Sequence, residues 1–249
     1  MNIDDIKLIG VIGGGVMGGG IAQVCAVSGY PVMIRDVTEE LLVKTRDAIM
    51  DGRYGLRTGL ERGKITQQQM DDAVGKLAFT TDVEDLRSAD LIIEAIPEDL
   101  ELKRKVFAEL DTLVRPEAIF ATNSSGFAIS HLNQAVARKD RFLGMHWFSP
   151  APVMRLIELV HAPETSEETV AALEALGERL GKVTIRVKDA PGEYGFVANR
   201  IYFAAVAEAR KVMEEGIATA DDINKAMRFG FNWPVGPLEM AAGARKGFA

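Results

Sequence analysis

Short apolar runs alternate with amphipathic segments along most of the chain. Apolar runs of strand length lie at residues 6–12, 31–35, 91–95, 118–121, 142–147, 153–160 and 183–187. Apolar residues at helical spacing predict helices at 16–28, 39–50, 67–75, 100–113 and 166–180. Strands that are apolar throughout and alternate with helices are typical of a parallel sheet covered on both faces. The pattern therefore predicts an α/β fold with a doubly wound, mostly parallel sheet.

This alternation stops after residue 188. A long helical pattern covers residues 196–215 and ends at Gly216, and Thr219 opens a further helix that has acidic residues in its first turn. We therefore expect two domains, an α/β domain at residues 1–190 and a smaller all-helical domain at residues 191–249. Pro191 and Gly192 are the predicted hinge between them.

Composition and charge narrow the class of protein. The chain has 249 residues, of which 47% are hydrophobic, and it contains no apolar run long enough to predict a membrane span. Its acidic N-terminus does not resemble a secretory signal, and its single cysteine, Cys25, fits a reducing compartment. The net charge of −7 argues against nucleic-acid binding. We expect a cytoplasmic protein with a small-molecule substrate and without a membrane partner, a nucleic-acid partner or a metal site.

A glycine-rich segment follows the first predicted strand and opens the first predicted helix. It fits G-x-G-x-x-G and consists of Gly13, Gly14, Gly15, Val16, Met17 and Gly18. In such a motif the first glycine permits a tight turn, the second lets the backbone approach a pyrophosphate, and the third lets the helix pack closely. The free N–H groups of the helix then face the phosphates. This context predicts a dinucleotide site.

The second predicted strand supports this interpretation and bears on the choice of cofactor. It ends in Arg35 and Asp36, and a carboxylate at that place accepts hydrogen bonds from the adenosine ribose hydroxyls. The same carboxylate repels a 2′-phosphate, which favours NAD over NADP. Arg35 keeps NADP open as an alternative, because its guanidinium could turn toward a phosphate.

Two residues on neighbouring predicted strands indicate acid–base chemistry. Glu158 is alone among apolar residues on a strand expected to be buried, so its carboxylate needs a partner. His146, near the end of the preceding strand, is the natural one. A carboxylate that fixes the tautomer of an imidazole and stabilises the imidazolium makes the histidine a usable base. A purely structural His–Glu hydrogen bond is the alternative at this stage.

Several further segments, taken together, resemble one enzyme family. They are V-I-G-G-G-V-M-G-G-G-I-A-Q from Val11, E-A-I-P-E from Glu94, N-S-S from Asn123, G-M-H-W-F-S-P-A-P-V-M-R-L-I-E from Gly144, G-F-V-A-N-R from Gly195 and G-P-L-E from Gly236. In this order and spacing they resemble the L-3-hydroxyacyl-CoA dehydrogenases, 3-hydroxybutyryl-CoA dehydrogenase among them. The resemblance covers essentially the whole chain and is far more specific than the glycine motif alone.

The resemblance implies a fold, an activity and a set of site residues. It implies a Rossmann-type domain followed by a helical domain that forms a homodimer, and the NAD-dependent oxidation of a 3-hydroxyacyl-CoA to a 3-oxoacyl-CoA. The implied catalytic residues are the base His146, its partner Glu158, Ser125 on the substrate hydroxyl, and Asn199 from the helical domain. Glu98, Lys103 and Ser125 match positions at the nicotinamide half of the cofactor site.

Basic residues after the second strand are candidates for the coenzyme A portion of the substrate. In the family this region forms a helix pair over the ligand, and Arg53 and Arg57, with Arg62 and Lys64, could meet its phosphates. A solvated helical face explains the same residues equally well.

The chain also departs from the family. Trp147 and Ser149 replace the usual phenylalanine and asparagine of the family, and Glu193–Gly195 resembles an insertion. Trp233 is a large aromatic residue at a position where the family tolerates smaller side chains. These changes suggest a reshaped acyl pocket, although local packing variation explains them as well. The sequence stops before the last helical turns of the family, so the helical domain is expected to be shortened. Two other functions remain: a related dehydrogenase of a non-thioester hydroxy acid, such as a crystallin-like sugar-acid or carnitine dehydrogenase, and a non-catalytic NAD-binding protein.

Overall fold

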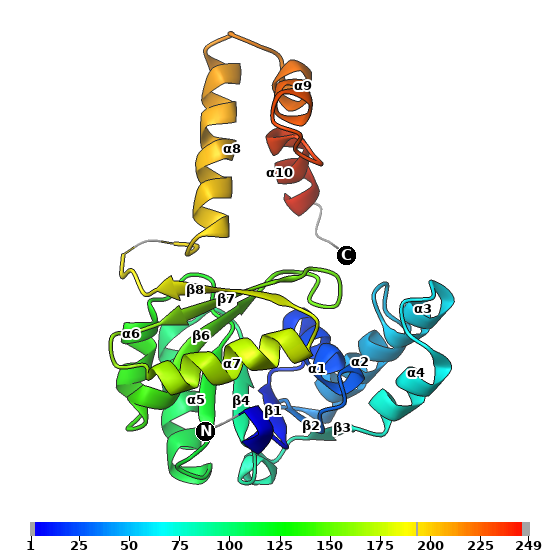
Figure 1. Ribbon diagram of the computed structural model, residues 1–249, viewed down its shortest axis with the longest axis vertical. Coiled ribbons are helices and arrows are strands. Elements are labelled where there is room, and N and C mark those ends of the chain that lie inside the picture. The colour runs from blue at the N-terminus through cyan, green and yellow to red at the C-terminus, as the bar shows by residue number, and fades with distance from the viewer. Residues whose placement is uncertain (1–2, 193, 246–249) are drawn as a thin grey trace. The chain divides into compact units, whose positions relative to one another are not determined.

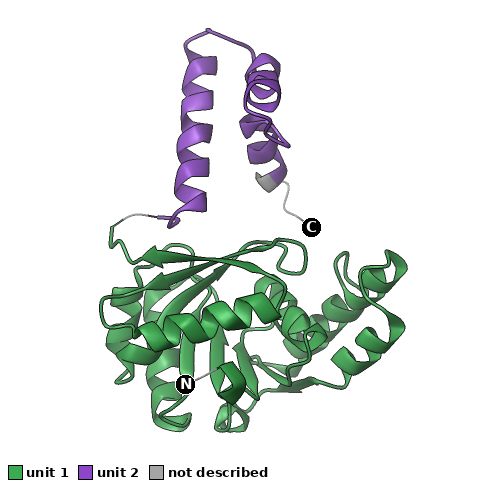
Figure 2. Ribbon diagram, in the orientation of Figure 1, with its two compact units in different colours: residues 1–193 green, residues 194–249 purple. Residues whose placement is uncertain are grey.

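The computed structural model describes residues 3–192 and 194–245, which divide into two compact units, residues 1–193 and 194–249 (Figure 2). The glutamate of the expected insertion, Glu193, and the last four residues of the chain lie outside the described residues.

The first unit is built on one eight-stranded sheet in the order β3-β2-β1-β4-β5-β6-β7-β8 (Figure 1). Its strands are β1 (Ile9–Ile12), β2 (Val32–Arg35), β3 (Leu77–Thr80), β4 (Leu91–Glu94), β5 (Ile119–Thr122), β6 (Phe142–Trp147), β7 (Leu156–His161) and β8 (Val183–Lys188). All neighbours are parallel except β6 and β7, which are antiparallel. The expected mostly parallel α/β sheet is confirmed.

Helices lie on both faces of this sheet (Figure 1). They are α1 (Val16–Val27), α2 (Glu39–Asp51), α3 (Leu56–Glu61), α4 (Gln67–Val74), α5 (Leu100–Leu113), α6 (Ile129–Leu132) and α7 (Glu167–Arg179), with short 3₁₀ turns at Ile3–Asp5, Val83–Leu86, Asn133–Ala135 and Lys139–Arg141. One core joins α1 and α7 to the sheet, with Ile21 and Leu173 fully buried in it. On α5, Phe107 packs edge-on against Phe142 of β6, with ring centroids 4.7 Å apart. Buried apolar surface of this kind is the main stabilising contribution to such a layered fold.

Two details of the sheet differ from the pattern-based prediction. Strand β3 was not predicted, because Leu77–Thr80 is a short edge strand with partly exposed residues and only one neighbour. The strand expected from residue 153 begins at Leu156 instead. Its first apolar residues belong to a turn in which the N–H groups of Val153 and Met154 both donate to the carbonyl of Pro150, at 3.0 Å. Apolar character alone does not reveal such a turn.

The second unit is helical and comprises α8 (Ala198–Glu214), α9 (Ala220–Gly230) and α10 (Pro237–Arg245). Thr219 caps α9 as expected, since its side chain accepts a hydrogen bond from the Asp222 N–H. The start of α10 is held by Asn224, whose side-chain oxygen accepts from the N–H of Leu238 at 3.0 Å. A Cβ at Gly236 would lie 2.4 Å from this asparagine, so only glycine allows the approach.

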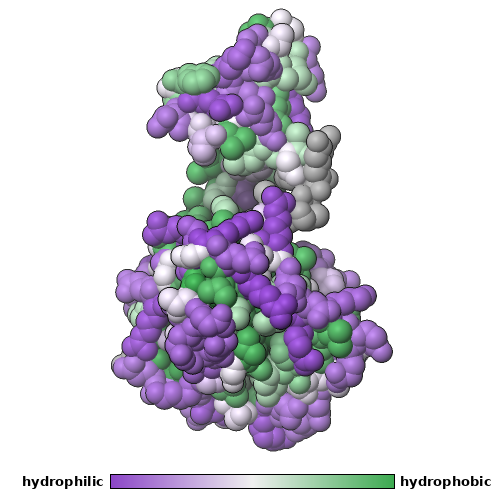
Figure 3. Space-filling model, turned by 90° about the vertical axis from the view of Figure 1, so that its right-hand side faces the viewer, coloured by the Kyte–Doolittle hydropathy of each residue, from purple (hydrophilic) through white to green (hydrophobic). Residues whose placement is uncertain are grey.

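None of the helices within residues 3–192 and 194–245 combines the length and the apolar character needed to cross a membrane. The surface of the helical unit nevertheless carries apolar side chains, several of which Figure 3 shows in green. Phe229 and Phe231 are 82% and 74% exposed, and Ile201 on α8 is 64% exposed. An exposed apolar surface of this kind is typical of a protein–protein contact.

Candidate active site

The glycine-rich loop connects β1 to α1, and each of its three motif glycines is required for a different structural reason. Gly13 has a φ of +90°, which favours glycine. A Cβ at Gly18 would lie 1.8 Å from the carbonyl oxygen of Gly13, so the first turn of α1 packs directly on the loop. A Cβ at Gly15 would meet nothing within 4 Å, so this backbone borders open space. The loop thus has the shape that a close-lying phosphate group requires.

Gly14, between the first two glycines of the motif, is held on both sides. The N–H of Gly14 donates to Asp36 Oδ2 at 2.7 Å, and its carbonyl accepts from Thr45 Oγ1 at 2.8 Å. Asp36 follows β2, whose carboxyl end lies beside that of β1, so sheet topology brings the carboxylate to the loop. Val16 and Met17 begin α1, and the first turn of this helix contains no acidic residue. The residues present fit a dinucleotide: an open glycine backbone, a helix N-terminus for phosphate and a carboxylate at the ribose position.

His146 and Glu158 occupy directly opposite positions of the antiparallel β6–β7 pair. His146 Nδ1 lies 2.7 Å from Glu158 Oε2, and the two side chains are 3% and 0% exposed. The contact expected from the sequence is therefore present. An ionised carboxylate only accepts hydrogen bonds, so Nδ1 carries the proton and Nε2 presents its lone pair. Glu158 thus sets the tautomer in which Nε2 can act as a base.

Ser125 lies on the other side of this imidazole, on the loop that follows β5. Its Oγ is 2.9 Å from His146 Nε2, so the hydroxyl donates to the lone pair of the ring. The loop itself is held by Glu98, which accepts from Ser124 Oγ at 2.5 Å and from the N–H groups of Ser125 and Gly126 at 3.1 and 3.0 Å. Burial raises the pKa of Glu98, but these hydrogen bonds and the Lys103 charge outweigh it, and the net shift is downward.

Lys103 is buried rather than exposed on its helix. Its Nζ lies 3.2 Å from Glu98 Oε2 and 2.5 Å from Glu94 Oε1. Glu94 is fully buried and also accepts from Thr122 Oγ1 at 2.6 Å. Sequence reasoning missed Glu94, although its signal resembled that of Glu158: a lone carboxylate on an otherwise apolar strand, here at the strand's end. The network ties the ends of β4 and β5 to the loop that carries Ser125.

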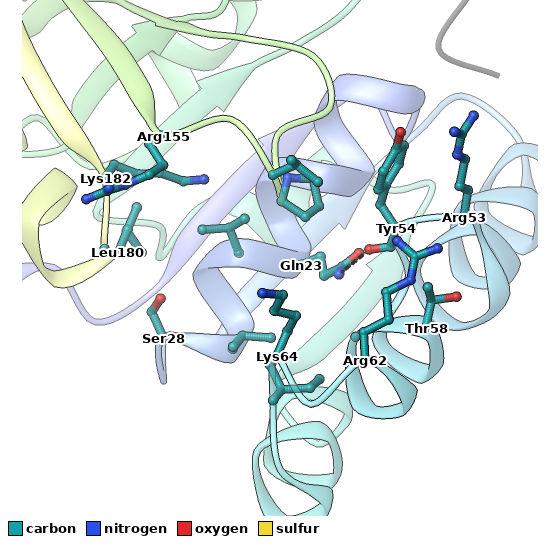
Figure 4. A pocket seen from close by; sticks show the side chains of 17 residues that line it. Gln23, Ser28, Arg53, Tyr54, Thr58, Arg62, Lys64, Arg155, Leu180 and Lys182 are labelled. Atoms are coloured by element: carbon teal, nitrogen blue, oxygen red, sulfur yellow. Dashed lines mark hydrogen bonds between the residues drawn. The ribbon is translucent and has the colours of Figure 1, made fainter. Parts of the chain in front are cut away.

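A pocket of about 480 Å³ opens on another side of the first unit, between the α3 region and the start of β7 and β8 (Figure 4). Arg53, Arg62 and Lys64 line it near α3, and Arg155 and Lys182 line it from the sheet side. No acidic side chain is among the residues that line it, although the chain as a whole is acidic. The pocket is therefore suited to an anionic ligand.

The remaining predicted residues occupy other places. Arg57 does not line this pocket; its guanidinium pairs with Asp51 at 2.6 Å. Asn199 lies in the first turn of α8, in the second unit, and its approach to His146 stays a prediction. Trp147 is buried, and its backbone N–H donates to Asn123 Oδ1 at 3.0 Å, whereas Ser149 is exposed.

Comparison with known proteins agrees with this geometry. The NAD-binding domain model of the 3-hydroxyacyl-CoA dehydrogenases matches residues 8–190, and their C-terminal domain model matches residues 195–244. The mitochondrial hydroxyacyl-coenzyme A dehydrogenase of Rattus norvegicus is 38% identical over 238 residues, 94% of this chain and 75% of that protein. A probable 3-hydroxybutyryl-CoA dehydrogenase of Deinococcus radiodurans is 39% identical over 93% of this chain and 81% of its own length.

A solved structure extends the likeness to three dimensions. The (S)-3-hydroxybutyryl-CoA dehydrogenase of Ralstonia eutropha superposes with a TM-score of 0.88 at 39% identity, covering 94% of this chain and 80% of that one. The two domain models together match nearly every described residue, in the same order as the two units. The chain therefore belongs to the 3-hydroxyacyl-CoA dehydrogenase family.

Proposed function

We propose that this protein oxidises the 3-hydroxyl group of an acyl-coenzyme A to a ketone, with NAD as the cofactor and His146 as the base. The observation that carries the proposal is the position of the imidazole, with Glu158 at Nδ1 and the Ser125 hydroxyl at Nε2. A base held in one tautomer beside a hydroxyl-binding group is suited to removing an alcohol proton. Membership of the 3-hydroxyacyl-CoA dehydrogenase family indicates which alcohol is the substrate, namely a 3-hydroxyacyl thioester.

The residues of the chain manage the proton. The substrate hydroxyl binds where Ser125 Oγ and His146 Nε2 meet, and Nε2 takes its proton as the C3–O bond becomes a carbonyl. Glu158 compensates the charge of the resulting imidazolium in a site from which water is largely excluded. In the reverse direction the same imidazolium returns the proton. Asn199 is proposed to orient the substrate oxygen from the helical unit.

The cofactor site is proposed to comprise the glycine loop with Val16 and Met17, Asp36, and the Glu98–Lys103 pair beside Ser125. When bound, NAD supplies the hydride acceptor for the C3–H bond. The loop residues hold its phosphates, and Asp36 is placed to accept from ribose hydroxyls while disfavouring a 2′-phosphate.

The basic pocket is proposed to receive the phosphates of coenzyme A. Arg62, Lys64 and Arg155 have no ion-pair partner within residues 3–192 and 194–245, so their charges are available to a ligand. Replacing Arg62 by alanine should raise KM for 3-hydroxybutyryl-CoA while leaving KM for its N-acetylcysteamine thioester unchanged, because the short thioester lacks the nucleotide. Arg87→Ala, at an exposed arginine paired with Glu84, is the matched control. An equal rise in KM with both thioesters would contradict the proposal that this pocket binds the coenzyme A phosphates.

The activity itself is tested by following NADH formation with a panel of 3-hydroxyacyl-CoA esters of different chain length and branching. The panel should include free 3-hydroxy acids, a sugar acid and carnitine. Turnover restricted to thioesters supports the proposal. Preference for a non-thioester would assign the chain to one of the related dehydrogenases, and NAD binding without any turnover would indicate a binding protein.

We also propose a homodimer formed through the helical unit, in the cytoplasm. The exposed Phe229, Phe231 and Ile201 provide apolar surface for a second copy, and the buried free thiol of Cys25 suits a reducing compartment. Light scattering on the purified chain gives the mass of the assembly. A monomer at micromolar concentration, or a wild-type-like dimer of the Phe229→Asp/Phe231→Asp variant, would refute this surface as the contact.

A further inference from the structure

Lys182 lies where α7 turns into β8, and its backbone is fixed by the end of the helix. Gly181 has a φ of +69°, and the N–H of Lys182 donates to the carbonyl of Gly177 at 2.9 Å. The N–H of Gly181 donates to the backbone carbonyl of Glu178 in the same turn, at 3.0 Å. These two hydrogen bonds around a glycine in the left-handed conformation form a Schellman motif, which caps the helix. The lysine side chain therefore starts from a well-defined point.

Its ammonium group binds a different part of the chain, the loop of residues 148–155 between β6 and β7. Nζ donates to the carbonyl of Ala151 at 2.6 Å and to the carbonyl of Met154 at 2.8 Å. The side chain is half-buried, and this burial lowers the pKa of Lys182. Nζ also lies 5.4 Å from the centroid of the Trp147 ring, within the range of a cation–π contact. Trp147 directly follows His146 in the chain.

The loop that Lys182 binds lines the basic pocket and also joins strands β6 and β7. Its residues Pro152 and Val153 line the basic pocket, in which Figure 4 shows Lys182 beside Arg155. Its two ends are the strands that carry His146 and Glu158. The loop also packs on α1, where a Cβ at Gly20 would lie 3.2 Å from Pro152. The loop therefore links one wall of the basic pocket to the two strands that carry the His–Glu pair.

We propose that Lys182 is a positioning residue for the acyl-coenzyme A substrate: its ammonium group fixes the 148–155 loop and the Trp147 ring, and so holds one wall of the basic pocket in place. This inference rests on the proposed function and deepens it. An ammonium group has three N–H donors, and two of them are engaged by the loop carbonyls. The geometry therefore favours holding the loop over contacting the ligand phosphates directly.

The test compares Lys182→Met, which keeps the length of the side chain but removes its charge and donors, with Lys182→Arg, which retains both. Lys105→Met, at an exposed lysine on α5, is the control. For Lys182→Met we expect KM for 3-hydroxybutyryl-CoA to rise about tenfold, equivalent to about 1.4 kcal/mol. The value of kcat and the affinity for NADH should stay within about threefold. Lys182→Arg should recover most of the loss, and Lys105→Met should resemble the wild type.

A spectroscopic measurement reports on the loop without any turnover. The chain has two tryptophans, so the Trp233→Phe background leaves Trp147 as the sole tryptophan. In this background Lys182→Met should shift the Trp147 emission to longer wavelength and increase its quenching by acrylamide. If the wild-type enzyme turned over no thioester, the proposed function would fail, but this fluorescence comparison would still test the loop contact.

Three outcomes would overturn the inference. An unchanged KM in a folded Lys182→Met protein would show that the contact does not affect the substrate. A raised KM with unchanged Trp147 emission and quenching would make Lys182 a direct ligand instead. Parallel losses of kcat, NADH affinity and melting temperature would assign it a general structural role.

Discussion

Replacing Glu158 by glutamine removes the charge beside His146 while preserving the size of the side chain. The amide oxygen can still accept from Nδ1, so the ring should keep its orientation and its tautomer. What the variant loses is the attraction between a carboxylate and the imidazolium formed during the reaction. Because both side chains are almost fully buried, solvent screens this attraction only weakly.

The size of the loss follows from the geometry. With Nδ1 and Oε2 2.7 Å apart, the two charge centres lie about 4 Å apart, and at an effective dielectric constant of about 20 they attract by about 4 kcal/mol. If this attraction develops only as the proton is transferred, its loss lowers turnover about 10³-fold. That figure falls within the range of about 10² to 10⁴ usually found for general-base catalysis.

The assay must separate this effect from a loss of stability. We expect Glu158→Gln and His146→Gln to bind NADH normally and to melt within a few degrees of the wild type, since about 1 kcal/mol shifts Tm by about 2–4 °C at this chain length. The double variant should be little slower than either single variant, because the pair acts as a unit. A merely structural pair predicts a loss of about 3–5 kcal/mol in stability, with turnover preserved in the folded fraction. Wild-type turnover by folded His146→Gln would refute the mechanism.

Four further predictions concern other residues. Asp36 should make the protein bind NADH more tightly than NADPH, and fluorescence titration with both cofactors would contradict this if NADPH bound better. Asn199→Ala should lower turnover without weakening NADH binding; equal damage to both would place this residue in the cofactor site or the core. Gly15→Ala should fold normally, because its Cβ meets open space, yet lose NADH affinity; unchanged affinity would show that no phosphate approaches the loop there. Burial raises the pKa of Cys25 to about 12, so the folded protein should resist iodoacetamide at pH 8 and react only when unfolded, as mass spectrometry would show; rapid labelling of the native state would contradict the burial.

The parts of the site that are local in sequence were predictable. The glycine loop and Asp36 follow from a motif with fixed spacing, and the structure shows why, since Gly14 bonds Asp36 directly. The His146–Glu158 contact was predictable from one physical rule, that a carboxylate on an apolar strand needs a partner. Apart from β3 and the short helices α3 and α6, the order of the elements in the first unit followed from the alternation of apolar strands and helices.

What the sequence concealed depends on contacts between distant segments. The Thr45 hydroxyl on α2 donates to the glycine loop, and Lys182 in the turn after α7 donates to the β6–β7 loop. In the sequence, each resembles an ordinary surface residue. Lys103 resembles an exposed helical lysine. Only the fold shows that its side chain is buried and forms an ion pair with Glu94. Edge strand β3 was missed because partial exposure weakens the apolar signal on which the prediction relied.

The β6–β7 ladder has a consequence for how members of this family can diversify. His146 and Glu158 are neighbours through backbone pairing, so their separation is independent of the length of the loop that joins their strands. Insertions or new side chains at residues 148–154 would therefore alter the wall of the basic pocket while His146 and Glu158 stay paired. A register slip of one residue would instead turn Glu158 to the opposite face of the sheet. Libraries aimed at the basic pocket should accordingly vary this loop and leave both strands intact.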